Sequence, residues 1–175
     1  MKKSQINCIE FNDIISDIVT NPVVMDMKKF YQHYDCTCFD HCLSVAFYSY
    51  LICKKLKLDY KSIARAAMLH DLFLYDWRVR QPDRKGLHAF KHPYVAYKNA
   101  SSLFDINDKE KDIILKHMWP LTIIPPKYLE SYIITLVDKF CALQEAYNYY
   151  TKRAVAKKQF RFTSILILFL FVHIP

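Results

Sequence analysis

The dipeptide His70-Asp71 is the feature of this sequence whose residue types point most directly to chemistry. It lies in the run AAMLHDLFL (residues 66–74), where an imidazole and a carboxylate stand among apolar side chains. Burying a charged group is unfavourable unless it is paired or binds a metal ion. The dipeptide therefore predicts a partner for both groups, and a divalent cation is the most direct one.

Three further ionisable residues occur in apolar segments with helical spacing. His41 lies beside apolar residues, His117 follows two isoleucines at spacings of four and three, and Asp138 ends the run IITLVD. Each one alone is compatible with a hydrogen-bonded core residue. Together with His70 and Asp71 they suggest one shared metal ion, because a cation supplies the positive charge that buried carboxylates lack.

The order His41, His70-Asp71, Asp138 resembles the H…HD…D pattern of the HD-domain superfamily of metal-dependent phosphohydrolases. The run AMLHD resembles the "A-x-L-H-D" helix end of that family, and VDK (residues 137–139) resembles its late "A/V-D" helix. The resemblance covers roughly residues 32–145. It implies that all four of these residues coordinate one divalent cation.

A second pair of histidines stands where two-metal members of the family have theirs. His92 begins a predicted helix and His117 ends one, so the resemblance implies a dinuclear site in which Asp71 bridges two ions. Met118 stands where the cyclic-di-nucleotide phosphodiesterases of the superfamily have a further His, and the sequence has no G-Y-P signature. That activity is not expected, and the chain is more similar to the small stand-alone bacterial HD phosphohydrolases.

The resemblance implies a phosphomonoesterase or phosphodiesterase that acts on a nucleotide or another small phosphorylated metabolite. Water on a divalent metal has a pKa lowered to about 7 in favourable cases, so metal-bound hydroxide is the expected nucleophile. The nitrogen and oxygen ligands favour one or two ions of Mn, Fe, Co, Ni or Zn. Two alternatives stay open: a di-iron oxygenase on an HD-like scaffold, and a non-catalytic helical binding module with a structural metal.

Other polar residues are candidates for the remaining roles. The candidates for catalysis, besides Asp71, are Asp76, His88 and Lys139. Asp76 could orient water or protonate the leaving group, and His88 shares a face with His92 if their helix starts early. The candidates for substrate binding are His33, Arg65 and Arg78. A solvated loop position for Asp76, and surface positions for the arginines, are the alternatives.

Composition and helix signals predict an all-α fold. The 175 residues include one glycine, which argues against strand-rich folds with many tight turns. We expect a single domain over 1–175, with a core at about 32–145, a basic and apolar extension at 151–175, and the metal site in the centre of six to eight helices. The expected helices cover residues 22–31, 40–56, 92–103 and 107–118. Another helix is expected to start at 59 or 62 and end between 71 and 75, and the last to start at 127 and end at 150 or 161. We expect a loop at 76–91 and N-caps at Asn21, Asp40, Asp59 and Asn107.

The net charge of +8 favours an anionic partner. The late basic cluster at 152–161 is interpreted as a solvated helix face, so nucleic acid is not expected as a partner. No apolar signal segment opens the chain, so we expect a cytoplasmic protein whose six cysteines are reduced and are structural or incidental rather than zinc ligands. A membrane-spanning helix needs about 20 apolar residues, and the apolar run 165–172 is shorter than that. We expect this run to be buried or to mediate homo-oligomerisation.

Overall fold

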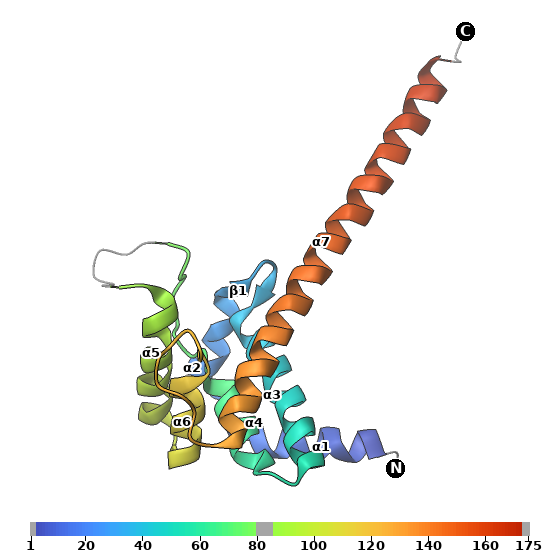
Figure 1. Cartoon of the computed structure of the whole chain (residues 1–175). Helices are drawn as coiled ribbons and strands as arrows, with labels where there is room; N and C mark the ends of the chain where they lie inside the picture. Colours follow the sequence, from blue (N-terminus) through green and yellow to red (C-terminus); the bar gives the residue numbers. More distant parts are fainter. Residues whose placement is uncertain (1–2, 80–85, 173–175) are drawn as a thin grey trace.

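The computed structural model describes residues 3–79 and 86–172, and for residues 3, 4 and 155–172 it defines the backbone alone. The described part is an all-α bundle, as predicted, with one short ribbon of two strands (Figure 1). The elements in chain order are α1 (Lys3–Val19), α2 (Pro22–Met25), the 3-10 turn η1 (Asp26–Lys29), β1 (Tyr31–His33), β2 (Cys36–Thr37), α3 (Cys38–Leu56), α4 (Tyr60–Leu69), α5 (His88–Leu103), α6 (Asp108–Lys116) and α7 (Leu129–Val172).

Side-chain caps begin three helices where the sequence predicted them. Asn21 accepts a hydrogen bond from the amide two residues on, and Pro22 takes the first helical position, where no amide hydrogen is needed. Asp59 caps α4 by accepting a hydrogen bond from the amide of Ser62, three residues on, at 3.1 Å. Asn107 accepts from the amide of Glu110 at 2.9 Å, while the Glu110 carboxylate accepts from the amide of Asn107 at 3.0 Å. This reciprocal capping box fixes the start of α6.

Two predicted boundaries before the site were wrong. The helix expected over 22–31 ends at Met25, because the chain then makes a 3-10 turn and enters the antiparallel β1–β2 ribbon. The cap of α3 is Thr37 rather than Asp40, since the Thr37 hydroxyl accepts from the Asp40 amide at 3.1 Å. The ribbon is tied to this helix start by the amide of Cys38, which donates to the carbonyl of Phe30 at 2.8 Å.

The start of α5 also differs, because this helix begins at His88, four residues before the predicted start. The His88 ring stacks between Trp77 and His92, with ring centroids 5.4 and 4.6 Å apart. The N-cap, Leu87, contributes no side-chain hydrogen bond. Ring packing against the preceding loop therefore fixes the first turn, and no local start signal exists in the sequence.

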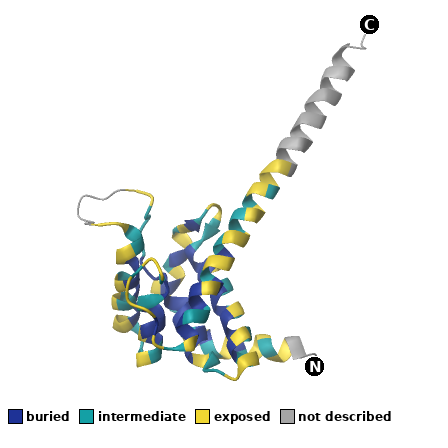
Figure 2. Cartoon of the chain, in the orientation of Figure 1, coloured by how far each residue is buried: buried dark blue, intermediate teal, exposed yellow. Residues whose placement is uncertain are grey.

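The core of the bundle forms around α3 and α4, with α1, α6 and α7 packed against them (Figure 2). On α4 the side chains of Ala64, Ala66 and Ala67 are fully buried, and their small size lets neighbouring helices approach closely. Larger side chains such as Tyr50 and Ile113 fill the remaining interior. This packing holds the end of α4, where His70 and Asp71 lie, in the middle of the bundle.

Helix α7 is longer than predicted and continues to Val172, so that it leaves the bundle along its own axis (Figure 1). Lys152 and Arg153 are exposed, as expected of a solvated basic face. The rest of the basic cluster and the apolar run 165–172 lie outside the described side chains. None of the helices in the described ranges is long and apolar enough to cross a membrane.

Candidate metal centre

The polar cluster of the core forms where α4 ends. His70 is the C-cap of α4 and Asp71 follows it, and both side chains are almost completely buried. Four other helices each bring one residue of the predicted metal-binding set to this point. These residues are His41 of α3, His92 of α5, His117 at the end of α6, and Asp138 of α7. The structure therefore gathers all six residues, although they span nearly one hundred positions of the chain.

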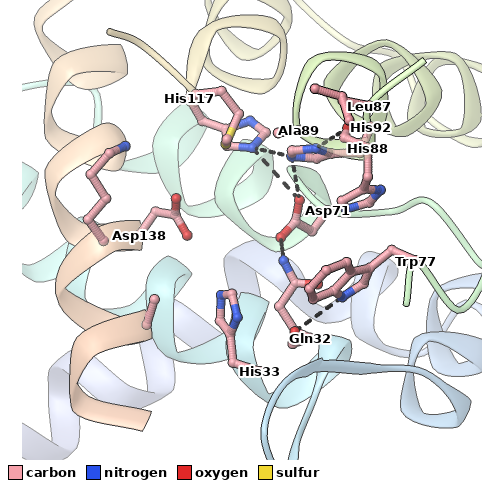
Figure 3. Close-up of a pocket in the computed structure, with 13 residues that line it drawn as sticks. Gln32, His33, Asp71, Trp77, Leu87, His88, Ala89, His92, His117 and Asp138 are labelled. Atoms are coloured by element: carbon pink, nitrogen blue, oxygen red, sulfur yellow. Dashed lines mark hydrogen bonds and ion pairs between the residues drawn. The ribbon is translucent and has the colours of Figure 1, made fainter. Parts of the chain in front are cut away.

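One side of the cluster consists of Asp71, His92 and His117 (Figure 3). Oδ1 of Asp71 lies 3.1 Å from Nε2 of His92 and 3.7 Å from Nε2 of His117. The two Nε2 atoms are 2.8 Å apart. Three potential ligand atoms thus converge on one point.

The other side consists of His41, His70 and Asp138, and it also includes Asp71. Nε2 of His41 is 3.0 Å from Oδ1 of Asp138, and Nε2 of His70 is 3.7 Å from the same oxygen. Nε2 of His70 is also 3.4 Å from Oδ2 of Asp71. The two carboxylate oxygens of Asp71 therefore face two different sets of histidines.

Backbone hydrogen bonds orient three of the imidazoles. Nδ1 of His70, His92 and His117 donates to the carbonyl oxygen of the residue three or four positions earlier, at 2.7, 3.0 and 2.8 Å respectively. These bonds commit Nδ1 as a donor and leave Nε2, the atom that faces the cluster, as the nitrogen available to bind a cation. Burial and the charges of neighbouring histidines lower the pKa of His117 to about 3, so this ring is neutral.

The carboxylates of the cluster are ionised. Burial raises the pKa of Asp71, but the charges of His70 and His92 outweigh it and hold that pKa well below its usual range. Burial likewise opposes ionisation of Asp138, and hydrogen bonds with His41 and His70 lower its pKa in turn. Buried negative charge of this kind is stable only beside positive charge, which the site is built to accept.

The donor set fits a divalent transition-metal ion. Nε2 of His70, Oδ1 of Asp71 and Oε2 of Glu145 are buried and make no hydrogen bond with any residue of the described ranges. Leaving such atoms without partners is costly, and a cation would satisfy them. Two groups of donor atoms, each within 4.8 Å of one another, share Asp71: His41 with His70, and His92 with His117. Mixed imidazole and carboxylate ligands suit Mn, Fe, Co, Ni or Zn.

A cavity of about 460 Å³ opens beside the cluster. Three residues with other predicted roles line it: His33, His88 and Lys139. The His88 ring is held by stacking and lies with Nδ1 3.1 Å from the Tyr75 hydroxyl. The ammonium of Lys139 donates to the carbonyls of Thr135 at 3.2 Å and Trp119 at 3.4 Å.

Three predicted site residues are not brought to the cavity, which corrects the sequence interpretation. Arg65 points to α1, where its guanidinium binds both carboxylate oxygens of Asp17 at 2.7 and 2.9 Å. Arg78 binds the carboxylate of Asp76 with two hydrogen bonds of 3.0 Å. None of Arg65, Asp76 and Arg78 is among the described residues that line the cavity. Both arginines are engaged with carboxylates of their own chain instead.

Two residues of the site were missed by the sequence interpretation. Gln32 of β1 donates from its amide to Oδ2 of Asp71, and Glu145 of α7 accepts from Nδ1 of His41 at 2.8 Å. Glu145 follows Asp138 by seven residues, two helical turns, so its place on the same face was a usable signal. Gln32 lies in a short ribbon without periodicity, and no pattern pointed to it.

Comparison with known proteins gives one match. The family model described as HD domain matches residues 38–143, more than half of the chain, and this span contains all six residues of the cluster. No curated protein and no solved structure matched the chain.

Proposed function

This chain belongs to the HD-domain family, and we propose that it is a metal-dependent phosphohydrolase that acts on a small phosphate ester. Members of this family are mostly hydrolases. The observation that carries the proposal is the position of Asp71, whose two oxygens face two sets of histidines at the wall of a cavity. We further infer that the HD unit has its core at about residues 32–145, with 151–175 as a basic and apolar C-terminal extension.

Two divalent cations would share the cluster in this proposal. His41, His70, Asp71 and Asp138 would hold one ion, and Asp71 would hold the second together with His92 and His117. When bound, the ions lower the pKa of coordinated water and offset negative charge on a phosphoryl group. The histidines present fixed Nε2 lone pairs to them, because their Nδ1 protons are committed to hydrogen bonds within the chain.

The side chains of the cavity wall have separate roles. Lys139 has three ammonium donors, and the carbonyls of Thr135 and Trp119 occupy two, so one remains for a phosphoryl oxygen. His33 lies at the wall, where its imidazole can hydrogen-bond the substrate. His88 acts as a positioning residue, because its stacking and its backbone carbonyl orient the His92 ring.

The composition of the wall favours a phosphate monoester over a polyphosphate. Among the described residues that line the cavity, Lys139 is the one lysine or arginine. A polyphosphate carries several charges, and proteins bind such groups with several cations or helix N-termini. The side chains of Trp77, Leu87 and Met118 offer apolar surface for an uncharged organic part of the substrate. The volume suits a small metabolite.

The test is metal analysis of protein purified without added metal, combined with hydrolysis of a panel of phosphate monoesters and diesters. We expect bound first-row transition metal and hydrolysis of a monoester, and we expect His70→Ala to abolish both. Asp13→Asn is the matched control, because it removes an exposed charge from α1, and it should change neither. Wild-type protein without metal, or hydrolysis that survives in His70→Ala, would overturn the proposal.

The same experiment separates the two alternative functions. Bound iron with substrate-dependent consumption of dioxygen, and no phosphate release, would indicate the di-iron oxygenase. Bound metal that no chelator removes without unfolding, with no turnover of any substrate, would indicate a structural metal in a binding module.

A further inference from the structure

Helix α7 carries a largely exposed apolar stripe, whose Phe140 and Tyr150 also make ring contacts at its edge with Tyr48 of α3 and with Tyr34 between β1 and β2. Six of its large side chains have exposed fractions between 57% and 71%: Leu129, Leu136, Phe140, Leu143, Tyr147 and Tyr150. The side toward the bundle is apolar as well, with Ile134 and Cys141 buried. A soluble helix that meets the core on one side normally carries polar residues on the other, and one that is apolar on both sides is normally covered on both.

The spacing of the stripe indicates what kind of surface covers it. From Leu136 to Tyr150 the exposed apolar residues recur at intervals of four, three, four and three, and Leu129 precedes Leu136 by seven. This is the heptad seam of a coiled coil, whose average interval of 3.5 residues keeps one stripe facing a partner helix. A flat surface or a sheet has no corresponding repeat.

We propose that α7 pairs along this stripe with α7 of a second copy of the chain. A second copy supplies a helix with the same repeat, so the surface is complementary to itself. The buried residues of α7, Ile134 and Cys141, lie on the other side of the helix from the stripe, and the helix leaves the bundle toward its C-terminal end (Figure 1). Two such helices can therefore lie side by side with the bundles on the outside.

The area and charge of the stripe agree with this pairing. At roughly 130–180 Å² of exposed surface per side chain, the six residues offer on the order of 800 Å², the area that each partner buries in a stable interface of standard size. Beside the seam lie Lys139, Gln144, Ala146 and Thr151. In a parallel pair Lys139 lies next to Gln144 of the partner subunit, so no like charges oppose each other there.

The test is the mass of the intact protein in solution, measured by sedimentation over a wide range of concentration. We expect a dimer for the wild type and a monomer for the double variant Leu136→Glu/Leu143→Glu. The matched control is Asn148→Glu/Lys152→Gln, which changes the net charge of α7 by the same amount at exposed positions outside the seam and should remain dimeric. Helix content by circular dichroism and bound metal should be the same in all three proteins, because none of these residues contacts the cluster.

Three results would overturn the proposal: a monomeric wild type, a seam variant that keeps the wild-type mass, or a control that dissociates as readily as the seam variant. The second result would assign any association to another part of the chain, such as the apolar run 165–172. A cysteine cross-link provides an independent measurement. Leu143→Cys should form an intermolecular disulfide in a parallel, in-register pair, whereas Asn148→Cys should not.

Discussion

Nε2 of His92 lies 2.8 Å from Nε2 of His117, although each ring already donates its Nδ1 proton to a backbone carbonyl. With Nδ1 committed on both rings, the two facing nitrogens have at most one proton to share between them. Oδ1 of Asp71 is 3.1 Å from one of them and is also an acceptor. Three potential ligand atoms around one point are stable only with a proton or a metal cation between them, so the proposed second ion rests most directly on this relationship.

The substitution His92→Ala should remove one of two bound ions. His41, His70, Asp71 and Asp138 remain to hold the other, so metal analysis should fall from two ions to one per chain, with hydrolysis lost or strongly reduced. Asn99→Ala on the same helix serves as the control, because the Asn99 amide donates to the carbonyl of Leu72 and makes no hydrogen bond with the cluster. Two ions retained in His92→Ala would show that this ring is not a ligand.

Glu145 should act through His41 as a positioning residue. Its carboxylate accepts from Nδ1 of His41 at 2.8 Å and fixes the ring so that Nε2 faces Asp138. Loss of such an outer partner typically lowers metal affinity about 10–100-fold. We expect that effect for Glu145→Ala in a competition titration with a chelator, a smaller one for Glu145→Gln, which keeps an acceptor, and none for the exposed neighbour Gln144→Ala. Equal affinity in Glu145→Ala and wild type would contradict the assignment.

Asp112 should make stability depend on acid pH. Burial raises its pKa, but Lys116, the amide of Lys127 and the hydroxyl of Ser131 outweigh this and lower it. Because the folded pKa lies below the unfolded value of about 3.9, the carboxylate stabilises the fold above that value. This contribution is lost as pH falls through the folded pKa.

The variant Asp112→Asn isolates that contribution. It should have a lower free energy of unfolding than wild type near neutral pH, and the difference should shrink as the pH falls below about 4. Urea unfolding of both metal-free proteins across this range measures it. A difference that stays constant with pH would mean that the charge of Asp112 contributes nothing.

Two isoleucines test the position of the core. Ile113 of α6 is fully buried behind the cluster, whereas the side chain of Ile123 is 96% exposed in the following loop. We expect Ile113→Ala to lower the free energy of unfolding by about 2–5 kcal/mol and Ile123→Ala by less than about 0.5 kcal/mol. Similar losses for both, measured by urea unfolding, would contradict the packing of α6.

The sequence allowed the helices and the polar cluster to be predicted where the signals are local. Caps such as Asn21 and Asn107 mark helix starts through bonds to residues two or three positions away, and the order from His41 to Asp138 carried the family pattern. The ion pair between Arg65 and Asp17 joins residues 48 positions apart, so no local pattern indicated that Arg65 points away from the cavity. The hydrogen bond between Gln32 and Asp71 could not be predicted for the same reason, because it depends on how the ribbon folds over α3.

The central claim is that Asp71 is shared by two metal ions, and Asp71→Asn tests it most directly. The amide is nearly the same size but has no negative charge, and it can offer only one oxygen to the two sets of histidines. Metal analysis of wild type, Asp71→Asn and His92→Ala purified side by side should give two, none and one ion per chain. Retention of two ions by Asp71→Asn, or loss of no more metal than in His92→Ala, would contradict the account.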